Sequence, residues 1–445
     1  MPGAARLPAA AAAAFAAALL TATGAGIAGD QRLTIGVPLL AAGFGAACLA
    51  ARRARQQAAV VVAAPWIADG LAAMAAIAVL LPPRDHPPTW YAIAYRAVPA
   101  AGILVAGLYA SGARAARYAI WSAIALVVAL QALTPIANPH PFIDVWAWSD
   151  AAARALLAGV NPYVVRAADV YRGGFAMGYE NTVYPYMPLT VVANAPATWI
   201  AGDYRFGLVL CLPLTILLVR AAGRRLAVDA AFVDAMTLAL VFMPRNTYLV
   251  SSGYSEPLLL LTIALFVFAA AARPFGSGAA TVFLLLPALK QYVLAPPLMF
   301  VAGAWRRRAW RPLAIAVAIA LATTVPFLLW NWHAALDGIV FQVRPSIAFR
   351  RDSASLTAVL AALTGIVPWH WLPEAAQIAV GGAAYWWLRD AGVAGLLLAS
   401  AIAVDASFLF GTQAFGNYYA FVTMLLLMAA LLFAGREREA VCAAR

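Results

Sequence analysis

The sequence predicts an all-α polytopic membrane protein, because apolar residues dominate it and charged residues are scarce. Of its 445 residues, 65% are apolar and 11% are charged, and the mean hydropathy is +0.84. A soluble chain carries roughly 45–50% apolar and about 25% charged residues. The composition therefore excludes a soluble enzyme, a disordered tail and a nucleic-acid-binding protein.

The net charge of +12 is a topology signal, because the arginines gather at the ends of apolar runs. Such clusters hold a loop on the cytoplasmic side of a membrane. The three cysteines lie far apart and indicate neither a disulfide framework nor a thiolate metal site. The arginine clusters are Arg52, Arg53 and Arg55; Arg114 and Arg117; Arg220, Arg224 and Arg225; Arg306, Arg307 and Arg308; Arg436 and Arg438.

Crossing the hydrocarbon layer takes about 20 apolar residues per helix. Among the first runs of about that length, an arginine cluster follows every second run. Five of them are 8–28, 33–50, 58–81, 91–111 and 118–136. The first is read as a retained span and not as a cleaved signal, because so many spans follow it. If the clusters at Arg52 and Arg114 are cytoplasmic, the N-terminus is inside and the loop 137–187 is external.

The later arginine clusters are cytoplasmic only if some of the apolar segments do not cross the membrane. The segment 188–200 is short and is expected to lie on or dip into the outer face, and 355–365 is expected at the interface. The stretch 279–304 is expected to form two half-length helices that meet at LKQY, with Lys290 at the turn. The remaining spans are 206–221, 230–248, 256–272, 312–330, 373–388, 391–411 and 417–434.

This reading gives about 14 membrane-crossing segments, two of them half-length, with interfacial juxtamembrane helices on the outer face. We expect four additional N-terminal spans in 1–112 and a core in 113–434 with outer loops 137–187 and 331–372. The tail 435–445 is expected inside, with both termini cytoplasmic. The outer face then collects most polar side chains, which suits an enzyme at the membrane–water boundary better than a transporter with midplane sites.

Lys290 is the only lysine, so arginines make up 29 of the 30 basic residues. A charge inside a span costs roughly 2.5–3.5 kcal/mol on insertion scales and is a functional-site hypothesis by default. One interpretation is that Lys290 binds a lipid phosphate, because its compact ammonium acts as a fixed point charge. The other is a side chain that extends to the outer headgroups.

The stretch 143–163 (IDVWAWSDAAARALLAGVNPY) is the most specific in the chain. Residues 146–158 are expected to form an interfacial amphipathic helix, with Trp146 on its apolar side and Ser149 opposite. Asp150 and Arg154 stand four residues apart, the spacing of an ordinary helical ion pair. Asp144 precedes this helix without a basic neighbour in sequence, as either an N-terminal helix charge or an uncommitted carboxylate.

Two proline- and tyrosine-rich motifs follow, GVNPY and VYPYMPL (183–189). Their prolines fix backbone angles and end helices. Tyr163, Tyr184 and Tyr186 provide flat, hydrogen-bonding surfaces. Such residues line sugar sites, and they also anchor proteins at the interface, which is the commoner case.

The order of these features resembles the GT-C superfamily of membrane glycosyltransferases, which use polyprenyl-phosphate sugars as donors. The order is a span, an Asp in the first large outer loop, a helix ending ALLAGVNPY, YPYMPL, and a lysine between two short helices. Over residues 118–434 the chain is most similar to the branch of mycobacterial phosphatidylinositol-mannoside mannosyltransferases. It departs from that pattern in the four spans before the Asp and in a Tyr of YPYMPL where a second Pro is common.

The resemblance implies an inverting transfer of a mannose-like or other sugar to a lipid or glycan acceptor on the outer face of a bacterial plasma (inner) membrane. It implies that Asp144 is the general base, with Asp150 as a secondary candidate. Its implied substrate contacts are Lys290, Gln291, Tyr163, Tyr184, Tyr186, His333, Arg344, Arg350, Arg351, Asn417 and Tyr418.

No cofactor is implied, and no cluster of metal ligands is visible in the sequence, so we expect a metal-independent reaction. The expected partners are the polyprenyl-phosphate-linked sugar, the acceptor and the lipid bilayer, with no nucleic acid. Two alternatives stay open. A transporter or flippase of lipid-linked saccharides would explain the spans and basic groups, and a non-catalytic envelope-assembly subunit would keep the fold without using Asp144.

Overall fold

The computed structural model describes residues 4–28, 32–54, 59–83, 87–112, 115–166, 170, 183–341, 350–367 and 369–443. Within them, eight helices are long and apolar enough to cross a membrane. This confirms the all-α membrane class, and the full number of crossing segments stays a prediction. The eight are α1 (Ala9–Ala28), α2 (Leu33–Arg53), α4 (Thr89–Ala110), α5 (Ala115–Ala137), α9 (Arg205–Arg225), α16 (Trp310–Trp330), α20 (Gly392–Leu409) and α21 (Tyr418–Ala443).

The beginning of the chain forms one half of a short two-stranded sheet. Strand β1 (Ala4–Pro8) pairs antiparallel with β2 (Ala59–Ala63), with Ala4 opposite Ala63. The expected span 58–81 therefore begins as a strand and becomes helical only in α3 (Ala64–Leu80). Three successive valines in β2 explain the difference, because β-branched side chains favour extended backbone.

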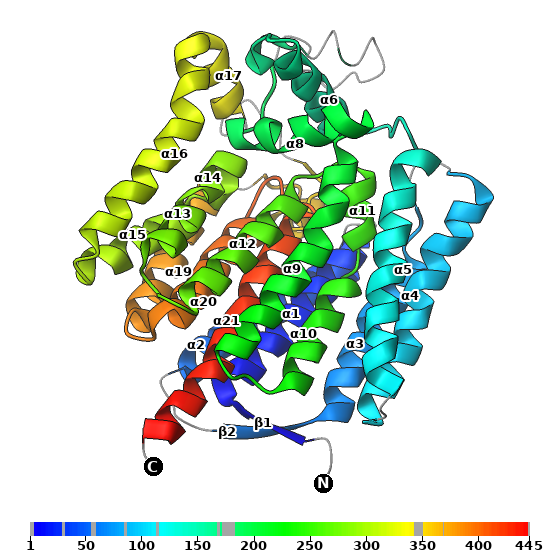
Figure 1. Ribbon diagram of the computed structural model, residues 1–445, viewed down its shortest axis with the longest axis vertical. Helices are drawn as coiled ribbons and strands as arrows, with labels where there is room; N and C mark the ends of the chain where they lie inside the picture. Colours follow the sequence, from blue (N-terminus) through cyan, green and yellow to red (C-terminus); the bar gives the residue numbers. More distant parts are fainter. Residues whose placement is uncertain are drawn as a thin grey trace.

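The four N-terminal helices belong to the same bundle as the rest. Helix α1 packs against α2 and α21, and α2 packs against α20. Helix α3 packs against α4, which in turn contacts α5. These helices, whose role the sequence left open, therefore form part of the wall of a single bundle. Its most buried members are α20 and α21, whereas α16 is largely exposed on its edge (Figure 1).

Shorter elements carry the chain between the long helices. The expected span 230–248 is broken after α10 (Ala230–Val241), and α11 (Asn246–Ser251) follows the left-handed residue Arg245. Helix α12 spans Glu256–Ala270. The other short elements are α6 (Asp144–Leu157), η1 (Pro162–Val164), α8 (Pro188–Ala201), α17 (Trp332–Phe341), α18 (Leu356–Thr364) and α19 (Leu372–Leu388).

The segment 277–306 is broken at LKQY, as the sequence indicated. Helix α13 (Ser277–Leu284) continues into α14 (Leu286–Leu289), and η2 (Gln291–Val293) leads into α15 (Ala295–Arg306). Lys290 stands between them with extended backbone angles, φ −155° and ψ 138°. The single lysine therefore occupies a helix break and not the middle of a continuous span.

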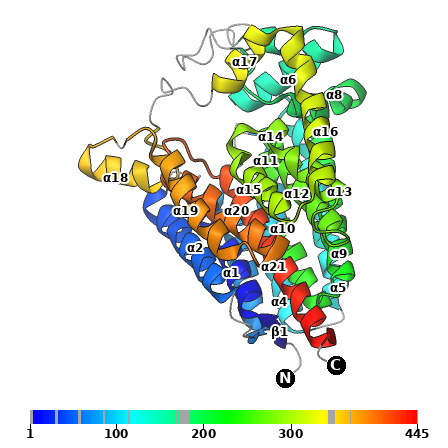
Figure 2. The same cartoon turned by 90° about the vertical axis from the view of Figure 1, so that its left-hand side faces the viewer.

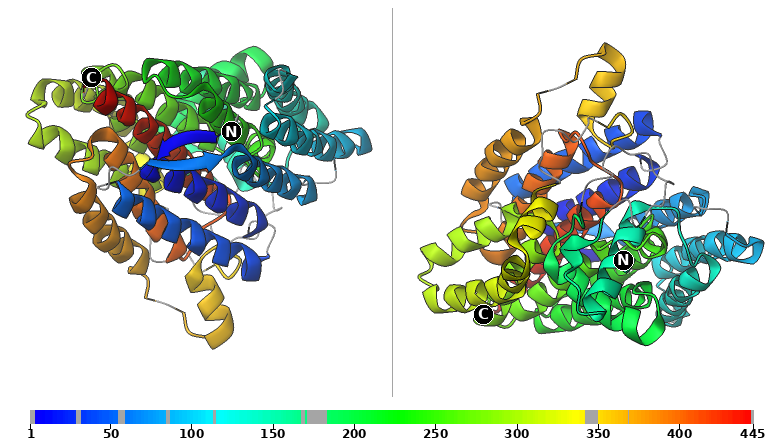
Figure 3. Two further views of the ribbon diagram at one scale, coloured as in Figure 1. Left: turned by 90° about the horizontal axis from the view of Figure 1, so that it is seen from below. Right: turned by 90° about the horizontal axis from the view of Figure 1, so that it is seen from above.

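The bundle has two chemically different ends. Both termini lie at one end, where β1 and β2 cross the surface (Figures 1 and 3). The arginine-rich end of α15 is there as well, since Arg306 pairs with Asp390 just before α20 begins. The end of α9 also belongs here, because Leu226 contacts Gly435 of α21. Which side of a membrane this end faces stays a prediction.

The opposite end carries the irregular segments. Helices α6, α8 and α17 cluster above the long helices, and α18 projects sideways from the bundle (Figures 1 and 2). Helix α21 connects the two ends. At about 1.5 Å per residue its 26 residues extend about 39 Å. The residues around Asp144 and Lys290 are therefore separated from the termini by the full length of the bundle.

Candidate functional site

A fully buried arginine fixes the start of α6. The Arg205 guanidinium forms a 2.6 Å ion pair with Asp203 and is 0% exposed. It also donates to the backbone oxygens of Asn138, Pro139 and Ser251, at 2.9, 3.3 and 3.0 Å. The Trp146 ring lies 5.6 Å from the guanidinium carbon. One side chain thus ties the loop before α6 to the ends of α8 and α11.

Helix α6 begins two residues earlier than expected and turns a different face inward. It starts at Asp144, and its buried residues are Trp148, Ser149, Ala152 and Ala153. The prediction that Ser149 lies on the exposed side is wrong. This happens because α8 and the tyrosine segments cover α6 on that side, so that the face with small residues becomes the packed one.

Asp144 occupies the first turn of α6, half-buried, and its Oδ1 accepts a 2.8 Å hydrogen bond from the Val145 amide. Burial raises the pKa of this carboxyl, and the Val145 amide and the charges of Arg350 and Lys290 act in the opposite direction. The fold therefore brings together three positions that are far apart in sequence. A half-buried carboxyl with two cations near it can accept a proton at a site where negative charge is tolerated.

The predicted pair of Asp150 with Arg154 is confirmed, at 2.8 Å between Nε and Oδ2. Asp150 is more enclosed than expected, with its side chain 16% exposed. Arg154 also donates to the Gly202 carbonyl at 2.7 Å, which joins α6 to the end of α8. Oδ2 of Asp150 thus holds Arg154, which joins the two helices, while its Oδ1 is buried without a partner within the described residues. The Asp144 carboxyl is bonded by backbone amides of its own turn.

The helix break at Lys290 is held from the α8 side. Thr190 of α8 donates to the Leu289 carbonyl at 2.6 Å, which the interruption of α14 would otherwise leave without a partner. Gln291 donates to the Pro185 carbonyl at 2.6 Å and to the Ile339 carbonyl of α17 at 3.4 Å. The predicted substrate contact Gln291 therefore has a structural bond to the YPYMPL segment.

Lys290 is not a free cation, because it lies in a glutamate cluster made of Glu256, Lys290, Tyr292 and Asn417. Lys290 Nζ stands 2.8 Å from Glu256 Oε1. The Asn417 amide and the Tyr292 hydroxyl donate to the same oxygen, at 2.8 and 3.1 Å. Lys290 is 5% exposed and Glu256 0%. A lone buried charge would be costly, and this pairing explains how the lysine is tolerated there.

Glu256 is the residue that sequence reasoning missed. It is the first residue of α12 and the only charged residue between Arg245 and Arg273. Lys290 is likewise the only charged residue between Arg273 and Arg306. Two isolated opposite charges at the same end of neighbouring apolar segments are a signal for an ion pair, and that signal could have been read.

Asn417 and Tyr418 stand at the start of α21, beside this cluster. The Tyr418 ring lies 4.8 Å from that of Tyr292, and Lys290 Nζ is 5.4 Å from the Tyr418 ring centre. Two other rings surround the ammonium, those of Tyr292 at 5.3 Å and Tyr254 at 6.0 Å. The structure therefore brings together Lys290, Asn417 and Tyr418, as the resemblance implied, around a carboxylate that it did not include.

The three predicted sugar-site tyrosines form a separate packed cluster. Tyr163 and Tyr184 are fully buried and Tyr186 nearly so, together with Trp148. In GVNPY, Asn161 Oδ1 accepts from the Tyr163 amide, and the Tyr163 hydroxyl donates to the Tyr186 carbonyl at 2.8 Å. Burial raises the pKa of Tyr163 and of Tyr184. In this state the rings support α6 from beneath and do not line an open surface.

The close approach of α17 to these tyrosines depends on a glycine. A Cβ at Gly338 would stand 2.1 Å from the Tyr184 carbonyl oxygen. Any larger residue there would push α17 away from the YPYMPL segment. Position 338 therefore sets the spacing between α17 and the YPYMPL segment.

The remaining predicted contacts differ in their placement. Arg350 makes a bidentate pair with Asp352, at 2.8 and 2.7 Å, and lies 5.1 Å from the Phe415 ring. His333 and Arg351 are exposed, with His333 on α17. Arg344 lies outside the described residues. The charge of Arg350 acts on Asp144.

Asp405 is a second buried acidic residue that the sequence reading did not single out. It lies one turn before the end of α20 and is 0% exposed. Neither carboxylate oxygen has a hydrogen-bond partner within the described residues. Ionisable groups inside a membrane span often mark a pathway for ions or protons, so Asp405 is a candidate for such a role. Asp405 therefore lies apart from the polar residues that the sequence places at the outer face.

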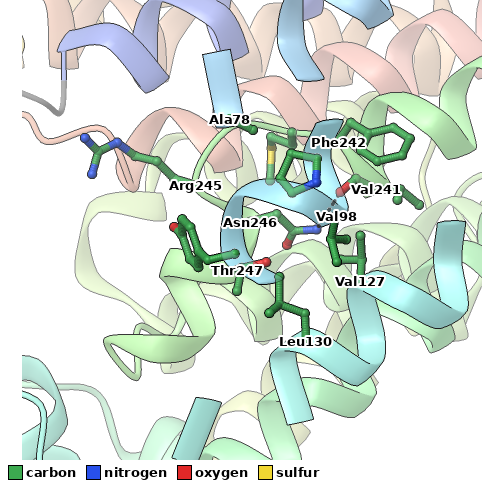
Figure 4. Close-up of a pocket in the computed structure, with 12 residues that line it drawn as sticks. Ala78, Val98, Val127, Leu130, Val241, Phe242, Arg245, Asn246 and Thr247 are labelled. Atoms are coloured by element: carbon green, nitrogen blue, oxygen red, sulfur yellow. Dashed lines mark hydrogen bonds between the residues drawn. The ribbon is translucent and has the colours of Figure 1, made fainter. Parts of the chain in front are cut away.

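The two best-defined cavities lie away from Asp144 and Lys290. One lies between α3, α4, α5 and the turn that joins α10 to α11, with Asn246 and Phe242 in its wall (Figure 4). The other lies beside Gln131 of α5, whose amide has no partner within the described residues. Neither is lined by the residues that the sequence assigned to substrate.

Within the described residues, no three His, Cys, Asp or Glu side chains gather as metal ligands would. Metal independence stays a prediction. Comparisons with protein-family models, with curated proteins and with solved structures find no match for this chain.

Proposed function

We propose that this chain is an integral-membrane glycosyltransferase that moves a sugar from a polyprenyl-phosphate donor to a lipid or glycan acceptor. The observation that carries the proposal is the position of Asp144. Its half-buried carboxyl stands at the end of the bundle opposite the termini, within the influence of Lys290 and Arg350. A proton acceptor in the electrostatic field of two cations suits the displacement of a lipid phosphate.

In the proposed reaction, Asp144 takes the proton of the acceptor hydroxyl as that oxygen attacks the anomeric carbon. A bond forms between the acceptor oxygen and this carbon, and the bond from the carbon to the phosphate oxygen breaks. The lipid phosphate leaves with the bonding electron pair, and the attack from the opposite face inverts the configuration. Positive charge from Lys290 and Arg350 stabilises the phosphate as it leaves. General-base help of this kind contributes roughly 10²–10⁴-fold to the rate.

The two aspartates of α6 give a matched test. Asp144→Asn keeps the side-chain oxygen that accepts from the Val145 amide but cannot take a proton. We expect it to reduce transfer by at least about 10²-fold with normal membrane yield. Asp150→Asn keeps an oxygen for Arg154, so transfer should stay within several-fold of wild type.

The assay is sugar transfer from a purified polyprenyl-phosphate donor to the acceptors of an isolated membrane. The reverse order of effects would move the base to Asp150. Full activity in both variants would remove the mechanism.

A transporter or flippase of lipid-linked saccharides is the second candidate, and Asp405 is the observation that favours it. An unpaired carboxyl within α20 has no role in the transfer mechanism. In a transporter that uses it to carry a proton or ion, Asp405→Asn abolishes movement of a labelled lipid-linked sugar across reconstituted vesicles. In a transferase the same variant keeps its transfer rate, so the two assays separate the candidates.

A further inference from the structure

We propose that Glu256 is a positioning residue that holds Lys290 in the unliganded protein and gives it up to the phosphate of the donor. Binding of the donor is then an exchange of ion-pair partners. This inference rests on the proposed function in one respect, namely that the ligand of Lys290 is a lipid phosphate. It assigns Glu256 a role that the resemblance does not include.

The first support is the charge state of the cluster. Lys290 and Glu256 are 2.8 Å apart, and both are buried, so together they present no net charge to an approaching anion. Within the described residues, Glu256 is the hydrogen-bond partner of the ammonium, which has three N–H groups. A phosphate therefore gains the full attraction of Lys290 only when it replaces the Glu256 carboxylate as partner.

The second support is the set of donors left behind. Glu256 Oε1 also accepts from Asn417 at 2.8 Å and from Tyr292 at 3.1 Å. Both donors are neutral, and they can hold the carboxylate after Lys290 has moved. Hydrogen bonds to a charged group are stronger than those between neutral groups. Oε1 of Glu256 therefore keeps two donors when the lysine moves, whereas Oε2 is buried and has no partner within the described residues.

The third support is the surroundings of the ammonium. The rings of Tyr254, Tyr292 and Tyr418 lie 5.3–6.0 Å from Nζ. An aromatic face attracts a cation within about 6 Å, so these rings stabilise the charge while its partners change. Lys290 also stands in a helix break with extended backbone, where its side chain is free of a surrounding helical turn.

Exchange predicts an unusual pair of effects for Glu256→Gln. The amide keeps an oxygen for Asn417 and Tyr292 but removes the negative charge, which leaves Lys290 buried without an anion. The unliganded variant should therefore unfold at a lower temperature than wild type. It should also bind a lipid phosphate more tightly, by on the order of tenfold, because no carboxylate competes for the ammonium.

The experiment measures binding of farnesyl phosphate to the full-length protein in detergent, with farnesol as the uncharged control ligand. The variants are Glu256→Gln, Lys290→Met and the double variant. Asp234→Asn is the matched control, because it removes the charge of a partly buried ion pair with Arg220 elsewhere in the bundle. Melting temperature is recorded for each variant with and without ligand.

Partner exchange is supported if Glu256→Gln melts lower and binds farnesyl phosphate about tenfold more tightly. The double variant should recover the melting temperature but bind no more tightly than Lys290→Met, and Asp234→Asn should bind like wild type. If Glu256→Gln does not fold, Glu256→Asp draws the carboxylate away from Lys290 and should also raise affinity.

Equal or weaker binding by the folded Glu256 variants would refute the exchange and leave the proposed function intact. If neither the wild type nor any variant bound farnesyl phosphate in preference to farnesol, the phosphate site itself would be refuted. The exchange would be refuted with it.

Discussion

Arg205→Met removes the side chain that holds the start of α6, and we expect a large loss of stability. Arg205 is fully buried and pairs with Asp203 at 2.6 Å. Breaking a buried pair from one side costs roughly 3–5 kcal/mol. The Asp203 side chain is 15% exposed and can regain some water, so we expect about 3 kcal/mol. The variant also leaves three backbone carbonyls without their donor, which adds to the loss of stability.

The assay is thermal unfolding in detergent, with Arg225→Met as the control. Arg225 is exposed at the far end of α9, where it donates a hydrogen bond to the Phe268 carbonyl. The control should melt close to wild type and transfer sugar normally. Arg205→Met should melt several degrees lower and lose transfer, because Asp144 is no longer held in place. An unchanged melting temperature for Arg205→Met would refute the reasoning.

Three further outcomes follow from the described contacts. Burial raises the pKa of Asp144. Because a general base must be deprotonated, the transfer rate should fall, as the pH is lowered, at a higher pH than it would with a carboxyl of ordinary pKa. Arg350→Gln should move that decline to still higher pH, which a pH–rate profile measures. Tyr184→Phe should not lower the melting temperature, because its hydroxyl has no partner within the described residues, whereas Tyr163→Phe should cost about 1 kcal/mol. Val160→Cys on a cysteine-free background should react with an impermeant reagent added from outside; protection there would refute the topology.

The sequence by itself determined the class of protein and most of the elements. A scarcity of charge and long apolar runs are enough to predict helices that cross a membrane, because the bilayer demands internally satisfied backbone. The break at Lys290 was also readable, because one continuous span over 279–304 would place the arginine cluster at Arg306 on the outer side. The three valines of β2 favour extended backbone, but they also suit a helix in a membrane, so the strand was decided by its pairing with β1.

The pair of Asp150 with Arg154 was determined by sequence, because four residues along a helix fix the geometry. The partners of Lys290 were not, because they come from α12, η2 and α21, whose mutual positions no local pattern specifies. In the same way, the local sequence could not specify which face of α6 is buried, because that depends on α8 and the tyrosine segments that pack over it.

Local chemistry thus determined which residues are unusual, and the tertiary structure decided what each of them does. Lys290 was conspicuous as the only lysine, but the fold showed that it is neutralised by Glu256. Tyr163 and Tyr184, which the resemblance assigns to the substrate, are fully buried in a packed cluster, and only the fold could place them there. The physical reason is that burial and charge pairing depend on neighbours that are distant in sequence, whereas helix formation and membrane crossing depend on neighbours that are adjacent.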